Sequence, residues 1–390
     1  MIPYGRQDIN QADIEAVVEV LRSDFLTQGP AVPAFEEAVA NYCGAKHAVA
    51  VNSATSALHI ACLALGVGKG DVVWTTPITF VASANCAMYC GATVDFVDID
   101  PRTYNLSVDR LAKKLAQAEK MGDLPKVIIP VHLCGQSCDM TGIHALSQQY
   151  GFRIIEDASH AVGGRYQGDP IGTCQYSDIT VFSFHPVKII TTGEGGMALT
   201  NDTHLARELR LFRSHGITSD AAVMHPRAPD ELWNYQQTDL GFNYRMTDIH
   251  AALGLSQMQR LDDFVAKRRS IAKRYDELLA DMPVVTPWQH LDSYSSFHLY
   301  VIRLKLGQIN MTHRQVYETL RADGIFVNLH YIPVYRQPYY EQMGFKVGYC
   351  AQAEQYYSEA ISIPIYPGLT EAQQSHVIDS LISALSSRPG

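Results

Sequence analysis

Short apolar segments alternate with amphipathic segments over the first 255 residues of the chain. The apolar segments have the length and composition of buried strands. Between them, Asp109–Leu115 and Gly142–Tyr150 repeat apolar residues with the spacing of one helix face. This alternation predicts an α/β fold with a mainly parallel sheet and helices on both of its faces. The expected strands are Ala48–Val51, Asp71–Trp74, Thr93–Val97, Val127–Val131, Arg153–Glu156, Ile179–Phe184 and Gly196–Leu199.

The last two of these strands are joined by a tight glycine-rich turn, so we expect one antiparallel strand in the sheet. Residues Thr200–Asp202 then predict the start of a helix. The stretch Ile217–Gln237, with Pro226 and Pro229, is polar and lacks periodicity. It is expected to form a long loop near an active site or an interface.

A long helical pattern from Thr247 to about Leu279 is expected to lead into a second, smaller α+β domain. We therefore predict a large domain over residues 1–255 and a small C-terminal domain over residues 256–390. The elements expected after the long helix are the strands Leu299–Leu304 and Ile325–His330 and the helices Thr312–Asp323 and Glu371–Leu385.

Composition and charge narrow the class of protein. Of the 390 residues, 47% are hydrophobic and 18% are charged, which predicts a folded chain with a substantial core. The formal net charge is −9 and the chain has no run of lysine and arginine, so we expect no nucleic-acid partner. The amino end turns polar at once, and no apolar stretch reaches about 18 residues. We expect a cytoplasmic protein without a membrane span.

The eight cysteines are scattered, and no histidine pair completes a structural-zinc spacing around them. Two pairs, Cys86/Cys90 and Cys134/Cys138, have the spacing of one helix face. We expect reduced thiols and no metal site.

The strongest candidate for chemistry is Lys188, which follows the strand Ile179–Phe184 and precedes a glycine-rich turn. Asp157 ends the preceding strand, at the edge where open α/β sheets bind ligands. A lysine and an acid so placed suggest a Schiff-base lysine and a partner for the pyridine nitrogen of pyridoxal 5′-phosphate (PLP). Taken singly, Lys188 also fits a surface loop and Asp157 a helix cap. Glu156 is expected to face the other side of the strand.

A phosphate site is predicted at Asn52–Ala57, which follows the first strand and opens an alanine-rich helix. Free backbone N–H groups and the helix dipole attract phosphate at such a position. Ordinary helix capping by Ser53 is the alternative.

Four motifs, in this order along the chain, resemble the DegT/DnrJ/EryC1/StrS family of PLP-dependent sugar aminotransferases, which have the fold-type-I architecture. They are Asn52–Leu58, Glu156–Ala161, Ser183–Lys188 and Gly241–Met246. The resemblance covers essentially the whole chain.

The resemblance implies a role for each matching residue. Lys188 would carry the cofactor and move protons, and Asp157 would pair with the pyridine nitrogen. His160 would support the cofactor or Asp157, and Phe80 would stack on the ring, with core packing as the alternative for both. The phosphate would be held by Ala54, Thr55 and Ser183, and by Asn243 of the neighbouring subunit in a homodimer with shared sites. Contacts to the sugar nucleotide would come from Tyr4, Asp24, Phe25, Leu26, Thr27, Ala54, Ser183, Asn243, His330, Tyr331, Ile332 and Pro333.

The segments Tyr4–Gln7, Phe25–Gly29, Thr191–Gly196 and His330–Pro333 resemble the members of that family that aminate C4 of a UDP-4-keto-6-deoxy-N-acetylhexosamine, on the way to pseudaminic acid. The expected amino donor is L-glutamate. Ile332 departs from the lysine usual in the last segment, which weakens a diphosphate contact there.

Three further residues were candidates on chemistry alone. Gln136 follows another strand, and Arg213 and Arg245 have the guanidinium that binds carboxylate or diphosphate, or forms a surface ion pair. Other functions also stay open. They are an aminotransferase for another nucleotide-linked keto sugar, a PLP-dependent sugar dehydratase and a non-catalytic protein of the same fold. The intact Lys188 and Asp157 argue against the last two.

Overall fold

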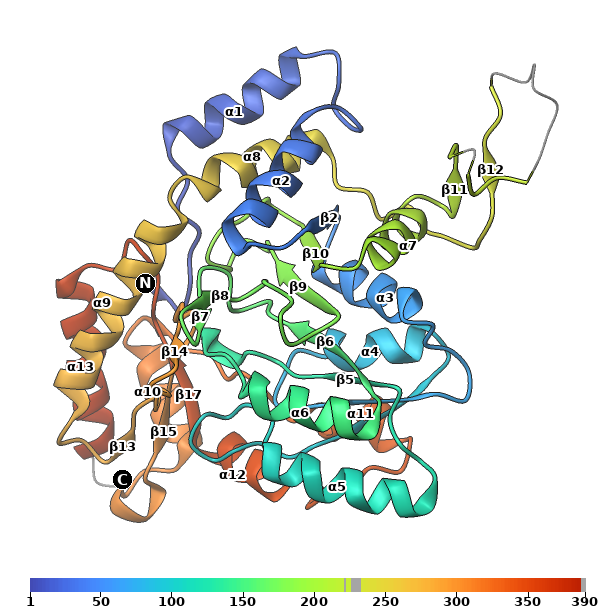
Figure 1. Ribbon diagram of the computed structural model, residues 1–390. Coiled ribbons are helices and arrows are strands. Elements are labelled where there is room, and N and C mark those ends of the chain that lie inside the picture. The colour runs from blue at the N-terminus through green and yellow to red at the C-terminus, as the bar shows by residue number, and fades with distance from the viewer. Residues whose placement is uncertain (221, 226–232, 387–390) are drawn as a thin grey trace.

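A computed structural model describes residues 1–220, 222–225 and 233–386. Its centre is a seven-stranded sheet with helices on both faces (Figure 1). The expected mainly parallel sheet is confirmed, and one strand, β10, runs antiparallel to both of its neighbours. In spatial order the strands are β2 (His47–Val51), β10 (Gly196–Thr200), β9 (Ile179–Ser183), β6 (Arg153–Asp157), β5 (Val127–Ile129), β3 (Val72–Thr75) and β4 (Thr93–Phe96).

The side chains of each strand alternate between two helical layers. Ile155 of β6 packs in a cluster with the first layer, whereas its neighbour Ile154 packs in a cluster with the second. Successive residues of a strand point to opposite faces, so this assignment also fixes the sides of the residues that follow. The first layer is α3 (Ala54–Ala64), α4 (Ala82–Tyr89) and α7 (Thr203–Arg213), and the second includes α5 (Val108–Met121) and α6 (Met140–Tyr150).

The pattern from Thr247 to Leu279 forms two helices and not the single helix that we expected. They are α8 (Asp248–Met258) and α9 (Leu261–Leu279). Arg260 lies between them with a φ of −116°, and its guanidinium contacts Asp8 at 2.6 Å and Asp13 at 2.5 Å. These contacts hold the residue outside helical geometry, and α1 (Gln11–Arg22) and α2 (Ala31–Cys43) pack beside α8.

A second hydrophobic core surrounds a three-stranded antiparallel sheet in the C-terminal part. The expected strand Ile325–His330 is only two residues long, and it pairs with the amino end of the chain, so that part also receives β1. The division after residue 255 stays a prediction. The elements are β13 (Val284–Val285), β15 (Tyr300–Leu304), β17 (Ala360–Ile363), β1 (Ile2–Pro3), β16 (Ile325–Phe326), α10 (His313–Ala322), α11 (Pro338–Glu341), α12 (Ala351–Glu359) and α13 (Glu371–Ser386).

Short ladders complete the fold. The expected loop Ile217–Gln237 begins and ends in a two-stranded ladder that projects from the body (Figure 1), while Pro226 and Pro229 lie outside the described residues. The ladders are β11 (Ile217–Thr218) with β12 (Gln236–Gln237), and β14 (Ser293–Tyr294) with β7 (Arg165–Tyr166) and β8 (Asp169–Pro170); the short 3-10 turns are Leu133–Gly135, Leu306–Gln308 and Val334–Arg336.

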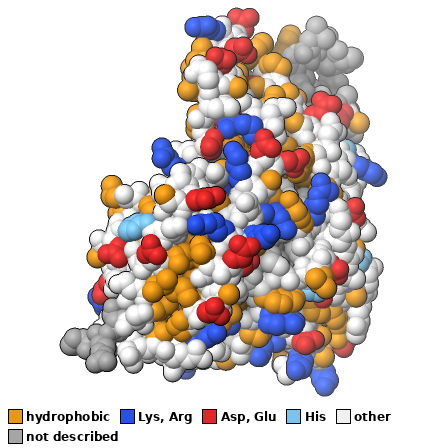
Figure 2. All heavy atoms as spheres, turned by 90° about the vertical axis from the view of Figure 1, so that its left-hand side faces the viewer, with side chains coloured by type: hydrophobic (Ala, Val, Ile, Leu, Met, Phe, Trp, Pro, Cys, Tyr) orange, Lys and Arg blue, Asp and Glu red, His pale blue; other side chains and the backbone are white. Residues whose placement is uncertain are grey.

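Positive and negative side chains are interspersed over the face shown in Figure 2, with apolar side chains between them. Opposite charges therefore offset one another across that face. In the part of the chain that the structure describes, every helix is too short or too polar to cross a membrane.

Candidate active site

A cavity of about 950 Å³ opens at the carboxyl edge of the central sheet, where α/β folds bind ligands. Residues that follow β2, β3, β6 and β9 line one side, and His298 and Asn328–Ile332 of the C-terminal part line the other. The cavity therefore collects segments that lie between Tyr4 and Gln337 in the sequence. Lys188 and Asp157 both face it.

Lys188 lies in the turn after β9, where its backbone N–H donates to the carbonyl of His185 at 2.9 Å. Enclosure by protein lowers the pKa of Lys188 to about 8, and the nearby Asp157 only partly opposes this shift. A lysine with a lowered pKa carries a free amine more often at neutral pH, and a free amine is the form that attacks an aldehyde.

The carboxylate of Asp157 is held by two donors. The Ser83 hydroxyl donates to Oδ2 at 2.6 Å, and the Ser159 backbone N–H donates to Oδ1 at 3.1 Å. Asp157 is 4% exposed, and Thr79 contacts Ser83 in turn at 2.7 Å. Ser83 could not be predicted from local sequence patterns, because it lies on α4, 74 positions away from Asp157.

The first turn of α3 forms an anion cradle. Its N–H groups at Ala54 and Thr55 have no acceptor within the helix, and both residues line the cavity. Ser53 also caps this helix, accepting from the Ser56 N–H at 3.1 Å, so capping and anion binding are compatible here. Ser183, at the end of β9, faces the same space.

Gly196 of β10 lies directly against this cradle. A Cβ atom at Gly196 would stand 2.4 Å from the backbone nitrogen of Ala54, which is one of the N–H groups that face the cavity. We expect Gly196→Ala to lower the free energy of unfolding by about 1–3 kcal/mol and to weaken the binding of PLP. Thermal unfolding and equilibrium dialysis measure the two effects.

Gly307→Ala is the matched control, because a Cβ there meets nothing within 4 Å. Equal PLP binding by the two variants would contradict the assignment of the cradle.

Three buried histidines surround Lys188, and burial lowers the pKa of each. For His330 the pKa falls to about 3, and for His160 and His298 it falls well below the ordinary value. His160 accepts from the Cys134 backbone N–H through Nδ1 at 3.3 Å, and its Nε2 lies 3.2 Å from the Tyr331 hydroxyl. The ring of His160 is thus hydrogen-bonded to Cys134 and Tyr331, and it stays neutral.

Sequence reasoning missed His298, whose ring centroid lies 4.4 Å from that of His160. Its Nδ1 is buried and has no hydrogen-bond partner among the described residues. The only local signal was a histidine just before the apolar strand β15.

The structure brings most of the expected residues together. Around Lys188 and Asp157, the cavity is lined by Tyr4, Ala54, Thr55, Phe80, His160, Ser183, His330, Tyr331 and Ile332. Phe80 is 59% exposed at the cavity, so core packing is the wrong explanation for it. Pro333 follows the lining segment without lining the cavity itself.

The remaining expected residues lie outside this cavity. Asp24, Phe25, Leu26 and Thr27 are exposed, and the Leu26 carbonyl accepts from the Asp248 N–H at 3.0 Å, at the start of α8. Asn243 is also exposed on the surface of the chain.

Two candidates chosen on chemistry alone have structural partners, and a third stays away from the cavity. Gln136 is buried outside the lining of the cavity, and its Nε2 donates to the Trp288 carbonyl at 3.0 Å. Arg213 forms an ion pair with Glu36 at 2.6 Å. Arg245 is not among the residues that line the cavity.

The residues present fit PLP. A carboxylate, an amine of lowered pKa and an anion cradle are the three groups that this cofactor needs, and all three face one cavity. All eight cysteines are free thiols. Within the described ranges, no group of three or more histidine, cysteine or acidic residues could hold a metal ion.

Comparisons with known proteins agree with this chemistry. Residues 7–382 match the model of the DegT/DnrJ/EryC1/StrS aminotransferase family. The chain is 38% identical over 383 residues to the spore coat polysaccharide biosynthesis protein SpsC of Bacillus subtilis, covering 97% of this chain and 96% of that protein. It is 37% identical over 387 residues to a UDP-4-amino-4,6-dideoxy-N-acetyl-beta-L-altrosamine transaminase of Campylobacter jejuni, covering 99% and 98%.

Among solved structures, Helicobacter pylori PseC, an aminotransferase involved in the biosynthesis of pseudaminic acid, superposes with a TM-score of 0.90. The two chains are 32% identical, and the match covers 98% of this chain and 99% of PseC. The family resemblance seen in the motifs is thereby confirmed, and with it the fold class. This chain is a member of the DegT/DnrJ/EryC1/StrS aminotransferase family.

Proposed function

We propose that this sugar aminotransferase uses PLP to transfer an amino group from L-glutamate to C4 of a UDP-4-keto-6-deoxy-N-acetylhexosamine. The substrate would be UDP-2-acetamido-2,6-dideoxy-β-L-arabino-hex-4-ulose and the product UDP-4-amino-4,6-dideoxy-N-acetyl-β-L-altrosamine. The observation that carries the proposal is that Lys188, Asp157 and the α3 cradle face one cavity. The sequence similarity to the Campylobacter jejuni transaminase supports this choice of sugar.

Different residues of the cavity would bind the phosphate, the pyridine nitrogen and the ring face of the cofactor. PLP, when bound, supplies an electron sink for the carbon that loses or gains the amino group. The N–H groups of Ala54 and Thr55 and the Ser183 hydroxyl would hold its phosphate. Asp157, aimed by Ser83 and Ser159, would keep the pyridine nitrogen protonated. Phe80, exposed at the cavity wall, would pack against the ring.

Lys188 would move the protons of both half-reactions. As a free amine it would take the proton from the α-carbon of glutamate, and it would later give a proton to C4 of the sugar. A pKa of about 8 suits both steps, because such an amine accepts and releases a proton near neutral pH. The neutral rings of His160, His298 and His330 add no positive charge that would compete with the protonated lysine.

The chain's own cavity is short of positive charge for such ligands. Lys188 is the one lysine or arginine among the described residues that line it, whereas the donor brings two carboxylates and the sugar nucleotide a diphosphate. We infer that a second copy completes the site. From the motif resemblance, and not from charge, we assign Asn243 and the segment Asp24–Thr27, which are exposed in one chain, to the neighbouring site of a homodimer. The Asn243 amide would add a hydrogen-bond donor to that site and no positive charge.

Mixing two inactive variants tests the shared site. Asn243→Ala and Lys188→Ala proteins each lack one essential group, but a hybrid dimer holds one intact site if Asn243 serves the partner. An equal mixture that exchanges freely would recover about a quarter of wild-type activity, since half of the dimers are hybrids with one good site of two. Turnover after subunit exchange, verified by mass, is the measurement.

The control mixture combines Lys188→Ala with Asp157→Ala. Both residues face the cavity of the same chain, so no hybrid site is intact and activity should stay absent. No recovery in the first mixture would count against the assignment of Asn243.

A spectral titration tests the function itself. Purified protein with PLP is treated with L-glutamate and then with the UDP-linked keto sugar. We expect glutamate to bleach the absorption band of the bound cofactor and the sugar to restore it. Bleaching without restoration would reject this sugar and leave another nucleotide-linked keto sugar, and a product without nitrogen would indicate a dehydratase. Absence of any band would reject the role of Lys188.

A further inference from the structure

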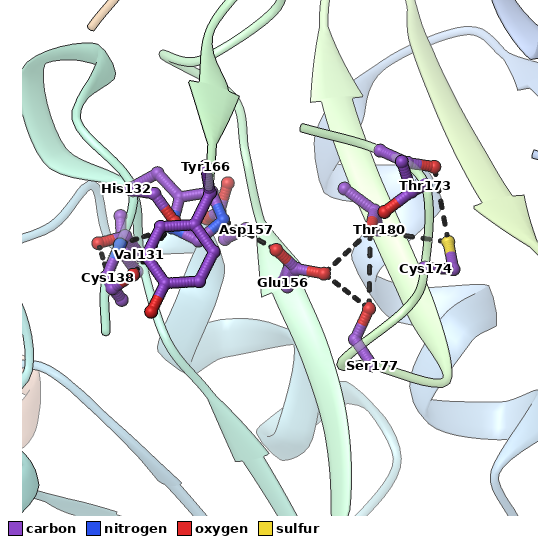
Figure 3. Close-up of polar contacts among 12 residues, drawn as sticks. Val131, His132, Cys138, Glu156, Asp157, Tyr166, Thr173, Cys174, Ser177 and Thr180 are labelled. Carbon is purple, nitrogen blue, oxygen red and sulfur yellow. Dashed lines mark hydrogen bonds and ion pairs between the residues drawn. The ribbon is translucent and has the colours of Figure 1, made fainter. Parts of the chain in front are cut away.

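Glu156 is a buried carboxylate that lies one residue before Asp157 and outside the cavity. Its Oε2 accepts from His132 Nε2 at 2.7 Å, and its Oε1 accepts from the hydroxyls of Ser177 and Thr180, the latter at 3.1 Å (Figure 3). Burial alone would raise the pKa of Glu156, but these hydrogen bonds outweigh burial and place its pKa below the ordinary value. The group is therefore a fully hydrogen-bonded buried anion, and none of the four residues lines the cavity.

The backbone fixes the direction of the hydrogen bond to His132. The Cys138 backbone N–H donates to His132 Nδ1 at 3.1 Å, so Nδ1 must present its lone pair. The ring hydrogen then lies on Nε2 and points to Glu156. Burial would lower the pKa of His132, but the contacts with Cys138 and with the Glu156 carboxylate raise it. However, protonating the ring would put a hydrogen on Nδ1, where it would point at the hydrogen of the Cys138 N–H. The hydrogen-bond geometry therefore favours a neutral His132 ring beside the Glu156 carboxylate.

His132 forms hydrogen bonds with both Glu156 and Asp157, the two successive acidic residues of β6. Its side chain binds Glu156, and its backbone N–H donates to the carbonyl of Asp157 at 3.1 Å. The Asp157 N–H donates to the carbonyl of Pro130 at 2.9 Å. On the other flank, Thr180 of β9 reaches Glu156, and Ala158 donates to the carbonyl of Val181 at 2.9 Å.

Glu156 thus links β6 to the start of β9 and to the segment that follows β5, on the face of the sheet away from Ser83. Asp157 leaves the same strand on the opposite face, where α4 brings Ser83 to its carboxylate. The backbone of Asp157 has little freedom to rotate as long as both faces are held. Without the hydrogen bonds of the Glu156 side chain, this part of β6 would shift and carry Asp157 away from Ser83 and from the cavity.

We propose that Glu156 and His132 are positioning residues that set the aim of Asp157 into the cavity without touching any ligand. The role rests on the proposed function of Asp157, and the geometry that it predicts can be tested without PLP. Supporting groups of this kind typically change affinity or activity by about 10- to 100-fold when removed.

Two pairs of variants test whether the hydrogen bonds of Glu156 and His132 position Asp157. In each pair, one variant keeps these hydrogen bonds and the other removes them. Glu156→Gln keeps an oxygen for His132 and an amide for the two hydroxyls, and His132→Gln keeps a donor for Glu156. We expect both to retain PLP affinity and turnover within about threefold, because the hydrogen bonds are preserved. Glu156→Ala and His132→Ala should weaken PLP binding and turnover by about 10- to 100-fold.

Asp98→Ala is the matched control for lost stability. Asp98 is another buried carboxylate, which accepts from the N–H groups of Gln352 and Ala353 at 3.0 Å at the start of α12, and it does not line the cavity. Both Asp98→Ala and Glu156→Ala should lower the melting temperature. Only Glu156→Ala should also weaken PLP binding and change the pH at which the cofactor band shifts.

Crystal structures of the cofactor-free variants give the test that is independent of PLP. We expect the hydrogen bond between Ser83 and Asp157 to be lost in Glu156→Ala and kept in Glu156→Gln. An unmoved Asp157 in Glu156→Ala, or a PLP affinity equal to that of Asp98→Ala, would overturn the inference. Failure of the wild-type protein to bind PLP would instead reject the proposed function. The crystal structures would still show whether Glu156 holds the Asp157 side chain in its orientation toward the cavity.

Discussion

Lys188→Ala is expected to lower kcat by at least about 10⁴-fold. The loss exceeds that of an ordinary general base, about 10²- to 10⁴-fold, because the same amine also anchors the cofactor. Lys188→Arg should be equally inactive, since arginine keeps its proton and cannot attack an aldehyde. Steady-state turnover with L-glutamate and the keto sugar measures the effect, and Lys69→Ala, an exposed lysine outside the cavity, is the control.

The pH dependence of cofactor capture follows from the same residue. Below its pKa the amine is protonated and cannot attack, so the rate at which the cofactor-free protein takes up PLP should rise with pH. The midpoint should lie near 8, where the pKa of Lys188 falls, and not near the ordinary value of 10.5. Stopped-flow absorbance measures this rate. A rate that still climbs above pH 10 would show that Lys188 is not enclosed as described, and turnover by Lys188→Ala within tenfold of wild type would reject its role.

Asp157→Asn is expected to cause the second-largest loss, about 10²- to 10⁴-fold in kcat, which we place in the range of a lost catalytic proton group. The amide has nearly the same shape but no charge to hold a proton on the pyridine nitrogen. Its NH₂ group would also compete with the donors that now fix the carboxylate, the Ser83 hydroxyl and the Ser159 N–H. Turnover and the position of the cofactor absorption band are the two readouts.

Ser83→Ala provides the graded control. It removes one hydrogen bond to Asp157 and leaves the charge, so a loss of about 10- to 100-fold is expected, in line with about 1.5–3 kcal/mol for a hydrogen bond to a charged group. We therefore expect kcat to decrease from wild type to Ser83→Ala and further to Asp157→Asn. Asp157→Asn that turns over within a few-fold of wild type would remove Asp157 from the reaction.

The sequence by itself determined the frame of the fold. Most strands of the central sheet are short segments rich in apolar residues, which the hydrophobic pattern is enough to predict. Ile179–Ser183 is one example, and the structure buries it along its whole length. The glycine-rich segment before Gly196 was enough to predict the antiparallel strand, but the connection is not the tight turn that we expected, because the twelve residues Phe184–Gly195 separate β9 from β10. Lys188 and Asp157 were placed in one cavity because strand ends of a mainly parallel sheet meet at one edge, and both positions follow from local pattern.

Only the tertiary structure decided which distant partners complete these residues. Ser83 reaches Asp157 from 74 positions away, and His298 enters the cavity from the C-terminal part of the chain. Gln136 and Arg213 had suitable chemistry, but Gln136 donates to the carbonyl of Trp288 and Arg213 pairs with Glu36. At the break between α8 and α9, Arg260 pairs with Asp8 and Asp13, which lie about 250 positions earlier in the sequence. Local patterns fix which side of an element is buried, whereas the choice of partner depends on how separate elements pack, and no short stretch of sequence contains that information.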